Sequence, residues 1–447
     1  DGSSKFGVNN RWGCFPSVAV GWRISEEAFY PKDFFINSLK FRASWGRLGN
    51  ENALGYYDFQ ALILSRNNRY GGGNAWPGSA SWTMENRGLK WETTDTKNIG
   101  FDFGMLSNKL TGSINYYINQ TEDLLITKRL SPSAGYQNPI LNVGKIRNNG
   151  VELEVNWTDK IKDFEYNVGF NFSTTKNKVV ELADKGQALP ATGLLYDTDH
   201  IPAYAKEGKP ISGFYLYRTD GIFQSDAEAE AWNAEHGTIV IVNGKEEWVG
   251  IQPNAKAGDI RFKDLDNNGV LDEDDKEYCG TGIPKFETNL NFSASYKGFD
   301  LSFSLSGVFG HKIYNGNRYF YESMNAPLNM LSTVANAWTP ENTHTDIPRA
   351  VNGDPNGNSR ESERFLENGS FVRLRQAQIG YTLPVSLLKK VKIEKLRFYI
   401  SGDNLFTITG YSGVDPEFST SSPLNSGVDR YIYPFTRSYT VGAQLTF

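Results

Sequence analysis

The chain has 447 residues, 39% of them hydrophobic and 14% aromatic, and it contains 44 glycines. No run of about 18 apolar residues occurs, which excludes a membrane-spanning helix. Because 46 basic residues face 51 acidic ones, a nucleic-acid partner bound through a basic face is disfavoured. A polar, aromatic-rich and glycine-rich chain of this kind is typical of a membrane β-barrel or a secreted β-sandwich.

Several stretches of the chain alternate between apolar and polar residues, which is the period-two pattern of a β-strand with two different faces. In chain order they lie at 99–105, 110–119, 151–158, 163–173, 288–296, 299–306 and 439–447. In the second of these, Leu110, Ile114 and Ile118 fall on one face, and Ser113 and Asn115 fall on the other. A helix cannot carry this pattern, because a period of 3.6 residues would spread the polar side chains around its axis. The sequence therefore predicts an all-β, antiparallel chain.

The connections between the predicted strands alternate between short and long. Short or medium turns are expected at 107–108, 159–163, 297–298, 26–37 and 384–394, and long connections at 50–90, 121–141, 181–284, 314–369 and 409–432. Outer-membrane barrels have short periplasmic turns and long external loops, whereas a sandwich would bury the apolar face as its core. The pattern favours a transmembrane barrel with 181–284 outside. Residues 1–7 are interpreted as a partial wall strand.

No catalytic or zinc-binding motif is present. The two cysteines, Cys14 and Cys279, are too few for a disulfide framework or a zinc site. The histidines are scattered without the spacing of a metal-binding pair, at His200, His236, His311 and His344. We therefore predict that the protein is not an enzyme.

The acidic segment 264–275 has the pattern of a twelve-residue calcium-binding loop. Oxygen-bearing side chains occupy positions 1, 3, 5, 9 and 12, a backbone carbonyl serves position 7, and Gly269 at position 6 allows the sharp bend. The predicted ligands are Asp264, Asp266, Asn268, Val270, Asp272 and Asp275. Position 12 is Asp instead of the usual bidentate Glu, and the flanking segments are not helical in pattern. The segment is therefore expected to bind a structural Ca²⁺ that stabilises the long external connection 181–284. The alternative is a solvated acidic turn without a bound ion.

Several segments together resemble the SusC/RagA family of TonB-dependent outer-membrane transporters. They include "LKFRASWGRLGN" (39–50), "NVGKIRNNGVELEVNW" (142–157), "GDIRFKDLDNNGVLDEDD" (258–275), "SFVRLRQAQIGYTLP" (370–384) and "LRFYISGDNLFTITGYSGVDPE" (396–417). The resemblance extends over essentially the whole chain. It implies that residues 1–447 are the carboxyl-terminal portion of a plugged 22-stranded barrel, about 12 strands of it, without the N-terminal plug and the first strands.

The resemblance also implies a function. It places the protein in the outer membrane of a Gram-negative, Bacteroidetes-like cell, as an active importer of glycans, oligosaccharides or peptides. It implies two partners, a SusD-like surface lipoprotein and the TonB–ExbB–ExbD complex, the latter reached through the absent N-terminal part. A passive porin and a soluble secreted carbohydrate-binding β protein are the alternatives.

Aromatic side chains in the external segments are candidates for contact with substrate or with the lipoprotein. They are Trp76, Trp82, Tyr196, Tyr204, Trp232, Trp248 and Trp338. For each of them, packing within its own loop is the alternative role, because Tyr and Trp are common in buried contacts.

Overall fold

The structure, a computed structural model, describes the whole chain apart from residues 71–73, 129, 131, 183–185, 187, 195–198, 243, 326, 389–392 and 421. It divides into two compact units. Unit 1 comprises Asp1–Ile161, Asn167–Gln187 and Lys206–Lys209, and unit 2 comprises Lys162–Tyr166, Ala188–Ala205 and Pro210–Phe447. No helix in the described part of the chain is long and apolar enough to cross a bilayer.

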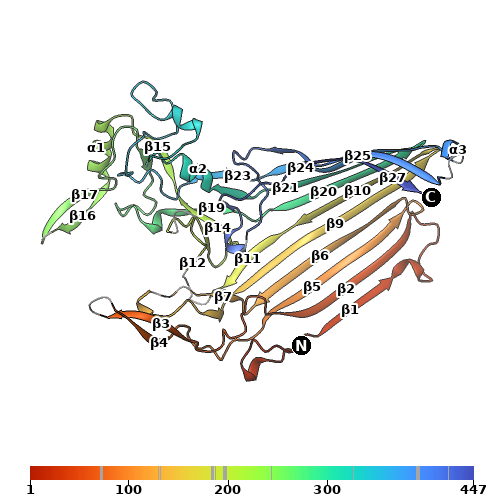
Figure 1. The fold of residues 1–447 in the computed structure, drawn as a ribbon, viewed down its shortest axis with the longest axis horizontal. Coiled ribbons are helices and arrows are strands. Elements are labelled where there is room, and N and C mark those ends of the chain that lie inside the picture. The colour runs from red at the N-terminus through yellow and green to blue at the C-terminus, as the bar shows by residue number, and fades with distance from the viewer. Residues whose placement is uncertain are drawn as a thin grey trace. The chain divides into compact units, whose positions relative to one another are not determined.

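Long antiparallel strands, here called wall strands, form most of unit 1, where β2, β5, β6 and β9 run side by side (Figure 1). The wall strands are β1 (Ser17–Arg23), β2 (Ile36–Asn50), β5 (Glu92–Met105), β6 (Leu110–Glu122), β9 (Lys145–Ile161), β10 (Phe164–Thr174) and β11 (Lys176–Glu181). Their order is β1-β2-β5-β6-β9-β10, and β11 pairs with β9. Two hairpins lie in the long connections, β3 (Ile63–Tyr70) with β4 (Asn74–Ser81) and β7 (Leu125–Thr127) with β8 (Ile140–Asn142).

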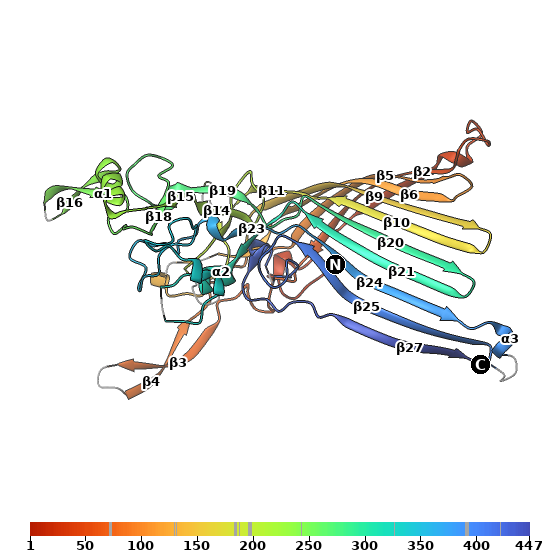
Figure 2. The same ribbon diagram turned by 90° about the horizontal axis from the view of Figure 1, so that it is seen from above.

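Unit 2 contains further wall strands, which also lie side by side (Figure 2). In paired order they are β20 (Phe286–Tyr296), β21 (Phe299–Phe309), β24 (Phe371–Thr382), β25 (Lys395–Thr409) and β27 (Ser438–Thr446). The helix α3 (Val385–Leu388) lies in the turn between β24 and β25.

Short elements fill the long connections of unit 2. The strands form four small sheets: β12 (Leu189–Pro190), β13 (Ala203–Ala205), β14 (Gly213–Tyr217) and β19 (Lys276–Thr281); β15 (Thr219–Ile222) and β18 (Ile260–Phe262); β16 (Gly237–Val242) and β17 (Lys245–Gly250); and β23 (Leu366–Asn368), β22 (Lys312–Asn315) and β26 (Val428–Asp429). The helices in these connections are α1 (Asp226–Glu235) and α2 (Gly316–Tyr321).

The strand register lines up the alternating apolar residues in cross-strand rows on one face of the wall. One row of unit 1 runs through Val20, Ala43, Ile99, Tyr116 and Val151, and one row of unit 2 runs through Ala294, Leu301, Ile379, Ile400 and Val441. These rows are exposed: 53% of the surface of Ile99 and 42% of the surface of Leu301 remain accessible. In a soluble sandwich both would be buried between two sheets. The sandwich alternative is therefore wrong.

The opposite face of the wall carries ion pairs and hydrogen bonds. In unit 1, Arg42 Nη2 lies 2.6 Å from Asp102 Oδ1. In unit 2, Arg397 pairs with Asp300. Because the side chains of a strand alternate between its two faces, this placement follows directly from the period-two pattern of the sequence.

The structure confirms the predicted strands and the predicted alternation of short and long connections, with one exception. The predicted strand at residues 1–7 is wrong, because this stretch folds back so that the Gly13 N–H donates to the Asp1 carbonyl. Phe6 is fully buried, in a cluster with Leu54, Leu89 and Leu125. Residues 1–7 thus pack under the loops of unit 1 and do not form a wall strand.

If the apolar rows meet lipid, as the resemblance implies, a charge placed on them is costly. We expect Ile379→Lys, in the second half of β24, to lower the free energy of unfolding in phospholipid bilayers by about 2 kcal/mol, because a lipid-facing Lys costs about 2–4 kcal/mol at mid-bilayer depth and less toward the interfaces. The matched control is Gln378→Lys on the opposite face of the same strand, which is expected to cost under about 1 kcal/mol. Denaturant unfolding of the intact protein in vesicles measures both, and equal costs would contradict the assignment of the faces.

Candidate functional site

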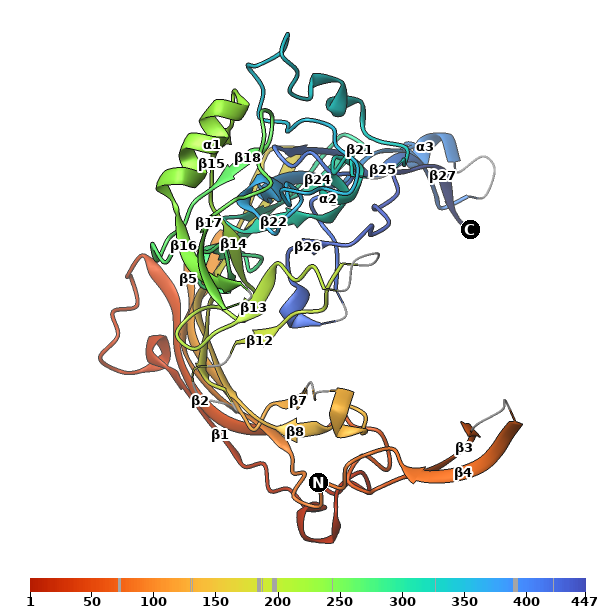
Figure 3. The same ribbon diagram turned by 90° about the vertical axis from the view of Figure 1, so that its left-hand side faces the viewer.

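The connections of unit 2 form one folded region, here called the outer region, which comprises the described residues of 188–205, 210–285, 310–370 and 410–437. Its core draws from all of these segments, with Ala203, Phe214, Tyr314, Phe365 and Val428 fully buried. Core residues come from two of the small sheets, β12-β13-β14-β19 and β23-β22-β26, of which β12, β13, β14, β22 and β26 are labelled in Figure 3. Segments far apart in sequence are thus held together by apolar burial.

Buried polar contacts add to this core. Asp259, which is fully buried, receives two hydrogen bonds from Arg349, at 2.8 Å from Nε and 3.0 Å from Nη2, and a third from Asn358 Nδ2 at 2.9 Å. Asn356 Nδ2 and Gln252 Nε2 both donate to the Ile260 carbonyl. Such paired, buried polar groups fix a loop in one arrangement, because an unpaired partner would keep its full desolvation cost.

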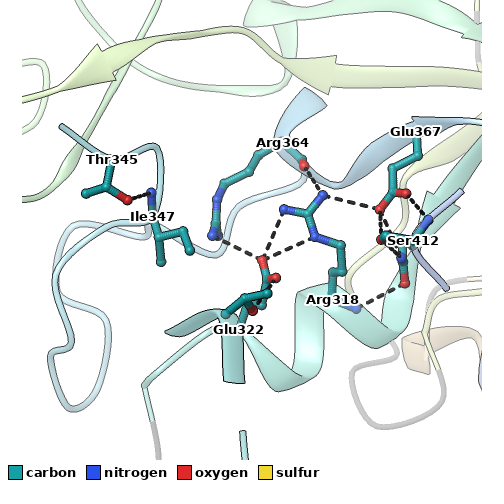
Figure 4. A network of polar contacts seen from close by, with 9 residues as sticks. Arg318, Glu322, Thr345, Ile347, Arg364, Glu367 and Ser412 are labelled. Atoms are coloured by element: carbon teal, nitrogen blue, oxygen red, sulfur yellow. Dashed lines mark hydrogen bonds and ion pairs between the residues drawn. The ribbon is translucent and has the colours of Figure 1, made fainter. Parts of the chain in front are cut away.

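A second network joins α2 to the connection after β25 (Figure 4). The Arg318 guanidinium lies 3.1 Å from Glu322 and 3.2 Å from Glu367. Arg364 pairs with the same Glu322 carboxylate at 3.2 Å. Glu367 also accepts the Ser412 N–H and hydroxyl, both at 2.7 Å. Hydrogen bonds from Ser412 are among the interactions that keep the pKa of Glu367 below its usual value despite burial.

The acidic loop 264–275 lies between β18 and β19, so its flanks are strands and not helices, in agreement with the sequence pattern. Carboxylate oxygens of Asp264, Asp266 and Asp275 lie within 4.8 Å of one another. Asn267 and Gly269 adopt positive φ angles of 60° and 81°, and these bend the backbone around the carboxylates. The structure therefore brings together three of the six predicted ligands.

The other three predicted ligands make local contacts. The Asn268 side-chain oxygen accepts the Val270 N–H at 2.8 Å. Asp272 caps the 3-10 turn Glu273–Asp275 and accepts the Asp274 N–H at 2.9 Å. Their oxygens are on the same loop as the carboxylate cluster, but a ligand role for them stays a prediction.

The carboxylate cluster lacks a compensating cation among the described residues. Asp275 is fully buried and accepts the N–H groups of Leu265 and Asp272, at 2.7 and 2.9 Å. Burial raises the pKa of Asp275, and the charges of Asp264 and Asp266 raise it further. Buried Lys276 follows directly, but its Nζ pairs with Glu273 at 2.7 Å and with Glu361 at 3.5 Å. The arrangement has the donor set and the charge that a hard dication requires.

Three of the predicted contact residues pack within the outer region. Trp338 is buried and its indole N–H donates to Gln224 Oε1 at 3.1 Å. The Trp232 ring stacks on His236, with 3.7 Å between centroids, and the Arg261 guanidinium lies 5.1 Å from it. Half-buried Tyr204 packs against the core of the outer region. These placements favour the loop-packing role for all three.

The remaining predicted contact residues differ in exposure. Trp248 in β17 is exposed and donates from Nε1 to the Asn233 carbonyl at 2.9 Å. Trp82, after β4, is half-buried. The side chain of Trp76 and the whole of Tyr196 lie outside the described residues. Of the predicted aromatic residues whose side chains the structure describes, Trp248 is thus the most exposed.

A polar cavity in the outer region was not predicted from the sequence. It has a volume of about 560 Å³ and lies in the segment after the 3-10 turn Ser332–Asn336. Its lining consists of Asn336, Asn342, His344, Thr345, Asp346 and Ile347. The run of amide, imidazole and carboxylate groups at 336–346 is the sequence signal that could have indicated it.

These features define an antiparallel β-barrel wall with a folded outer region. Residues 1–405 match the family model described as "TonB dependent receptor-like, beta-barrel". The chain belongs to this family of outer-membrane β-barrel receptors, which are transporters and not enzymes.

Individual members of this family and one solved structure are similar to the chain over its whole length. The "TonB-dependent receptor P3" of Formosa agariphila is 32% identical, and "TonB-dependent receptor SusC" of Bacteroides thetaiotaomicron is 27% identical; each match covers 100% of this chain and 43% or 41% of the relative. A solved structure described as the RagAB peptide transporter matches with a TM-score of 0.78 at 27% identity, over 100% of this chain and 45% of that one. The chain thus spans less than half the length of the relatives that it matches, and the SusC/RagA resemblance is confirmed.

The contact between the acidic loop and the β16–β17 hairpin gives a test of the local packing. A Cβ on Gly269 would lie 2.1 Å from the Gly237 carbonyl oxygen, whereas Gly244 has a similar φ of 79° but open space around it. We expect Gly244→Ala to lower the local opening free energy by about 1 kcal/mol, because alanine disfavours the left-handed backbone conformation. Gly269→Ala is expected to lower it by about 1–3 kcal/mol more, because the backbone at Gly237 must also move away from the new methyl group.

Hydrogen exchange at the amides of β16 and of the acidic loop measures the local opening free energy. Equal effects of the two substitutions would contradict the close approach of Gly269 to Gly237.

Proposed function

We propose that the intact protein is an energised importer of hydrophilic nutrients, either oligosaccharides or peptides, and that this chain forms part of its barrel wall. The observation that carries the proposal is the separation of the two wall faces. Exposed apolar rows occupy one face, while the other holds the pairs Arg42–Asp102 and Arg397–Asp300. A polar, hydratable surface suits a path for hydrophilic solutes, and the same charges against lipid would be costly.

Two features support contact with such solutes or with a surface partner. The cavity at Asn336–Ile347 is lined by hydrogen-bonding groups, among them His344 and Asp346. Exposed Trp248 offers a flat ring that could stack on a sugar or on a protein surface. The description of RagAB as a peptide transporter supports peptides as one of the two substrate classes.

In this proposal the outer region is the surface on which a SusD-like lipoprotein closes, and the TonB–ExbB–ExbD complex supplies the energy. The outer region is held in a fixed shape by the contacts of Asp259 and Glu322. A fixed shape suits a docking surface, because binding then costs little conformational entropy. A passive porin is the competing function, and it differs in needing neither the complex nor the lipoprotein.

Gene deletion and uptake assays test the import function. We expect loss of the receptor gene to abolish growth on either an oligosaccharide mixture or a peptide mixture, while growth on free sugars and amino acids continues. Uptake should stop when a protonophore is added, and the intact receptor should purify together with a lipoprotein. Steady conductance of the purified receptor in planar bilayers, with uptake unaffected by the protonophore, would support the porin instead.

We also propose that the acidic loop binds Ca²⁺ as a structural staple of the outer region, through Asp264, Asp266 and Asp275 with Asn268, Val270 and Asp272. The converging carboxylates, which have no cation partner in the part of the chain that the structure describes, support this, as does the positive φ of Gly269 at the required bend. Burial raises the pKa of Asp275 most, and the ion would lower the repulsion from Asp264 and Asp266 that adds to it. A weak extracellular-type site, with Kd of about 10⁻⁴–10⁻³ M, is expected.

Calcium should stabilise the protein in a pH-dependent way. A hundredfold excess of Ca²⁺ over its Kd contributes about 2.7 kcal/mol, seen as a rise in the unfolding temperature of the outer region. Because the pKa of Asp275 is raised, the metal-free loop loses stability as pH rises through that pKa, and Ca²⁺ binding is lost as pH falls through it. The gain should therefore be large at neutral pH and small in acid.

The Asp275→Asn variant should lose most of the calcium response, and exposed Asp274→Asn is the matched control that should keep it. Calorimetry that detects no Ca²⁺ binding to the unmodified receptor at neutral pH would contradict the proposal.

A further inference from the structure

Exposed basic side chains gather near the ends of the unit 1 strands that carry the long connections. These residues, here called the basic patch, are Lys97 in β5, Arg147 in β9, and Lys176 and Lys178 in β11. Strand pairing holds them together, because Lys178 is in register with Arg147 and Lys176 with Asn149. The backbones of the three patch residues in β9 and β11 therefore lie within about 8 Å of one another.

The basic patch lies on the same face of the wall as the exposed apolar rows. Residues an even number of positions apart on a strand share a face, so Lys97 shares the face of Ile99, and Arg147 that of Val151. Ile99 and Val151 belong to one of the rows assigned to lipid. Because β5 and β9 reach the long connections just beyond the patch, it lies at the external end of the wall, at the level of the headgroups.

The positive charge of the basic patch is not balanced by the carboxylates around it. The last three cross-strand rows of this face, from β2 to β11, hold six basic and three acidic side chains. Asp95 pairs with Arg47 at 2.8 Å, Glu122 pairs with Lys145 at 2.5 Å, and Glu181 is in register with the same lysine. Within the described part of the chain, the four patch side chains form no salt bridge. This face therefore presents excess positive charge to its surroundings.

We propose that the basic patch binds the phosphate groups of a phosphorylated glycolipid in the external leaflet, with the chemistry of lipopolysaccharide. Gln120 Oε1 accepts from Arg147 Nε and Nη2 at 3.2 and 2.7 Å, which holds the guanidinium in place without neutralising it. A guanidinium binds phosphate through several N–H donors, and the ammonium groups of Lys176 and Lys178 add positive charge beside it. Continuity with the lipid-facing rows favours a membrane lipid over a protein as the occupant.

Binding of purified diphosphoryl lipid A to the intact receptor in a nonionic detergent tests this proposal. The patch variant combines Arg147→Gln with Lys178→Gln. The matched control combines Arg23→Gln with Lys32→Gln, which removes one exposed Arg and one exposed Lys at the short-turn end of the same unit. Native mass spectrometry gives the Kd of each protein for the lipid, and heat-modifiable gel mobility verifies that each variant has a folded barrel.

We expect the patch variant to bind lipid A about thirtyfold more weakly than the unmodified receptor, because each basic side chain beside anionic headgroups contributes about fivefold. The control variant should bind as the unmodified receptor does, because salt screens charges that lie farther away than about 10 Å. Lipid A without its phosphates should bind the unmodified receptor as weakly as lipid A binds the patch variant.

Equal affinity of the patch variant and the unmodified receptor for lipid A would overturn the proposal, as would equal losses in the patch and control variants. Equal affinity of the unmodified receptor for lipid A and for its dephosphorylated form, or for phosphatidylglycerol, would overturn the choice of a phosphorylated glycolipid. The proposal rests on the lipid-facing assignment of the apolar rows, which the comparison of Ile379→Lys with Gln378→Lys decides separately.

Discussion

One constraint governs the wall of this protein: two adjacent residues of a strand face two different solvents. A one-residue slip in register would turn Ile379 toward the polar face and Gln378 toward lipid, and the pairing of every neighbouring strand would suffer the same exchange. The continuous apolar rows and the ion pairs on the opposite face are both consequences of holding the register. A protein under this constraint needs little hydrophobic core in its wall, which explains why its large apolar side chains are exposed in the isolated chain.

The wall could be predicted from the sequence because its signal is local. The alternation from Leu110 to Ile118 identifies a strand and its faces without knowledge of any distant residue. The prediction for residues 1–7 failed because this stretch has no alternation of its own, and Phe6 is buried by Leu54, Leu89 and Leu125, which lie far away in sequence. The count of wall strands is nevertheless close to the prediction, since β11 is an additional wall strand that the sequence pattern did not separate from β10.

The outer region was predictable only in part, because only some of its contacts are local in the sequence. The acidic loop was visible because its donors lie within twelve residues, and the structure brings Asp264, Asp266 and Asp275 together as the spacing suggests. The buried Asp259–Arg349 pair and the Arg364–Glu322 pair join residues that are tens of positions apart. No local spacing in the sequence could therefore predict them. Aromatic residues show the same limit, because identity alone does not separate Trp338, which is buried, from Trp248, which is exposed.

The short strand β26 has a consequence for the biogenesis of the protein. It pairs in parallel with β22 through Tyr314 and Val428, and it supplies Asp429, whose carboxylate accepts the Tyr411 hydroxyl at 2.6 Å. Closure of a contact between positions more than a hundred residues apart carries an entropic cost that must be met before the contact stabilises anything. The outer region therefore cannot complete its fold before the segment that carries β26 is available, long after its first strands have been made.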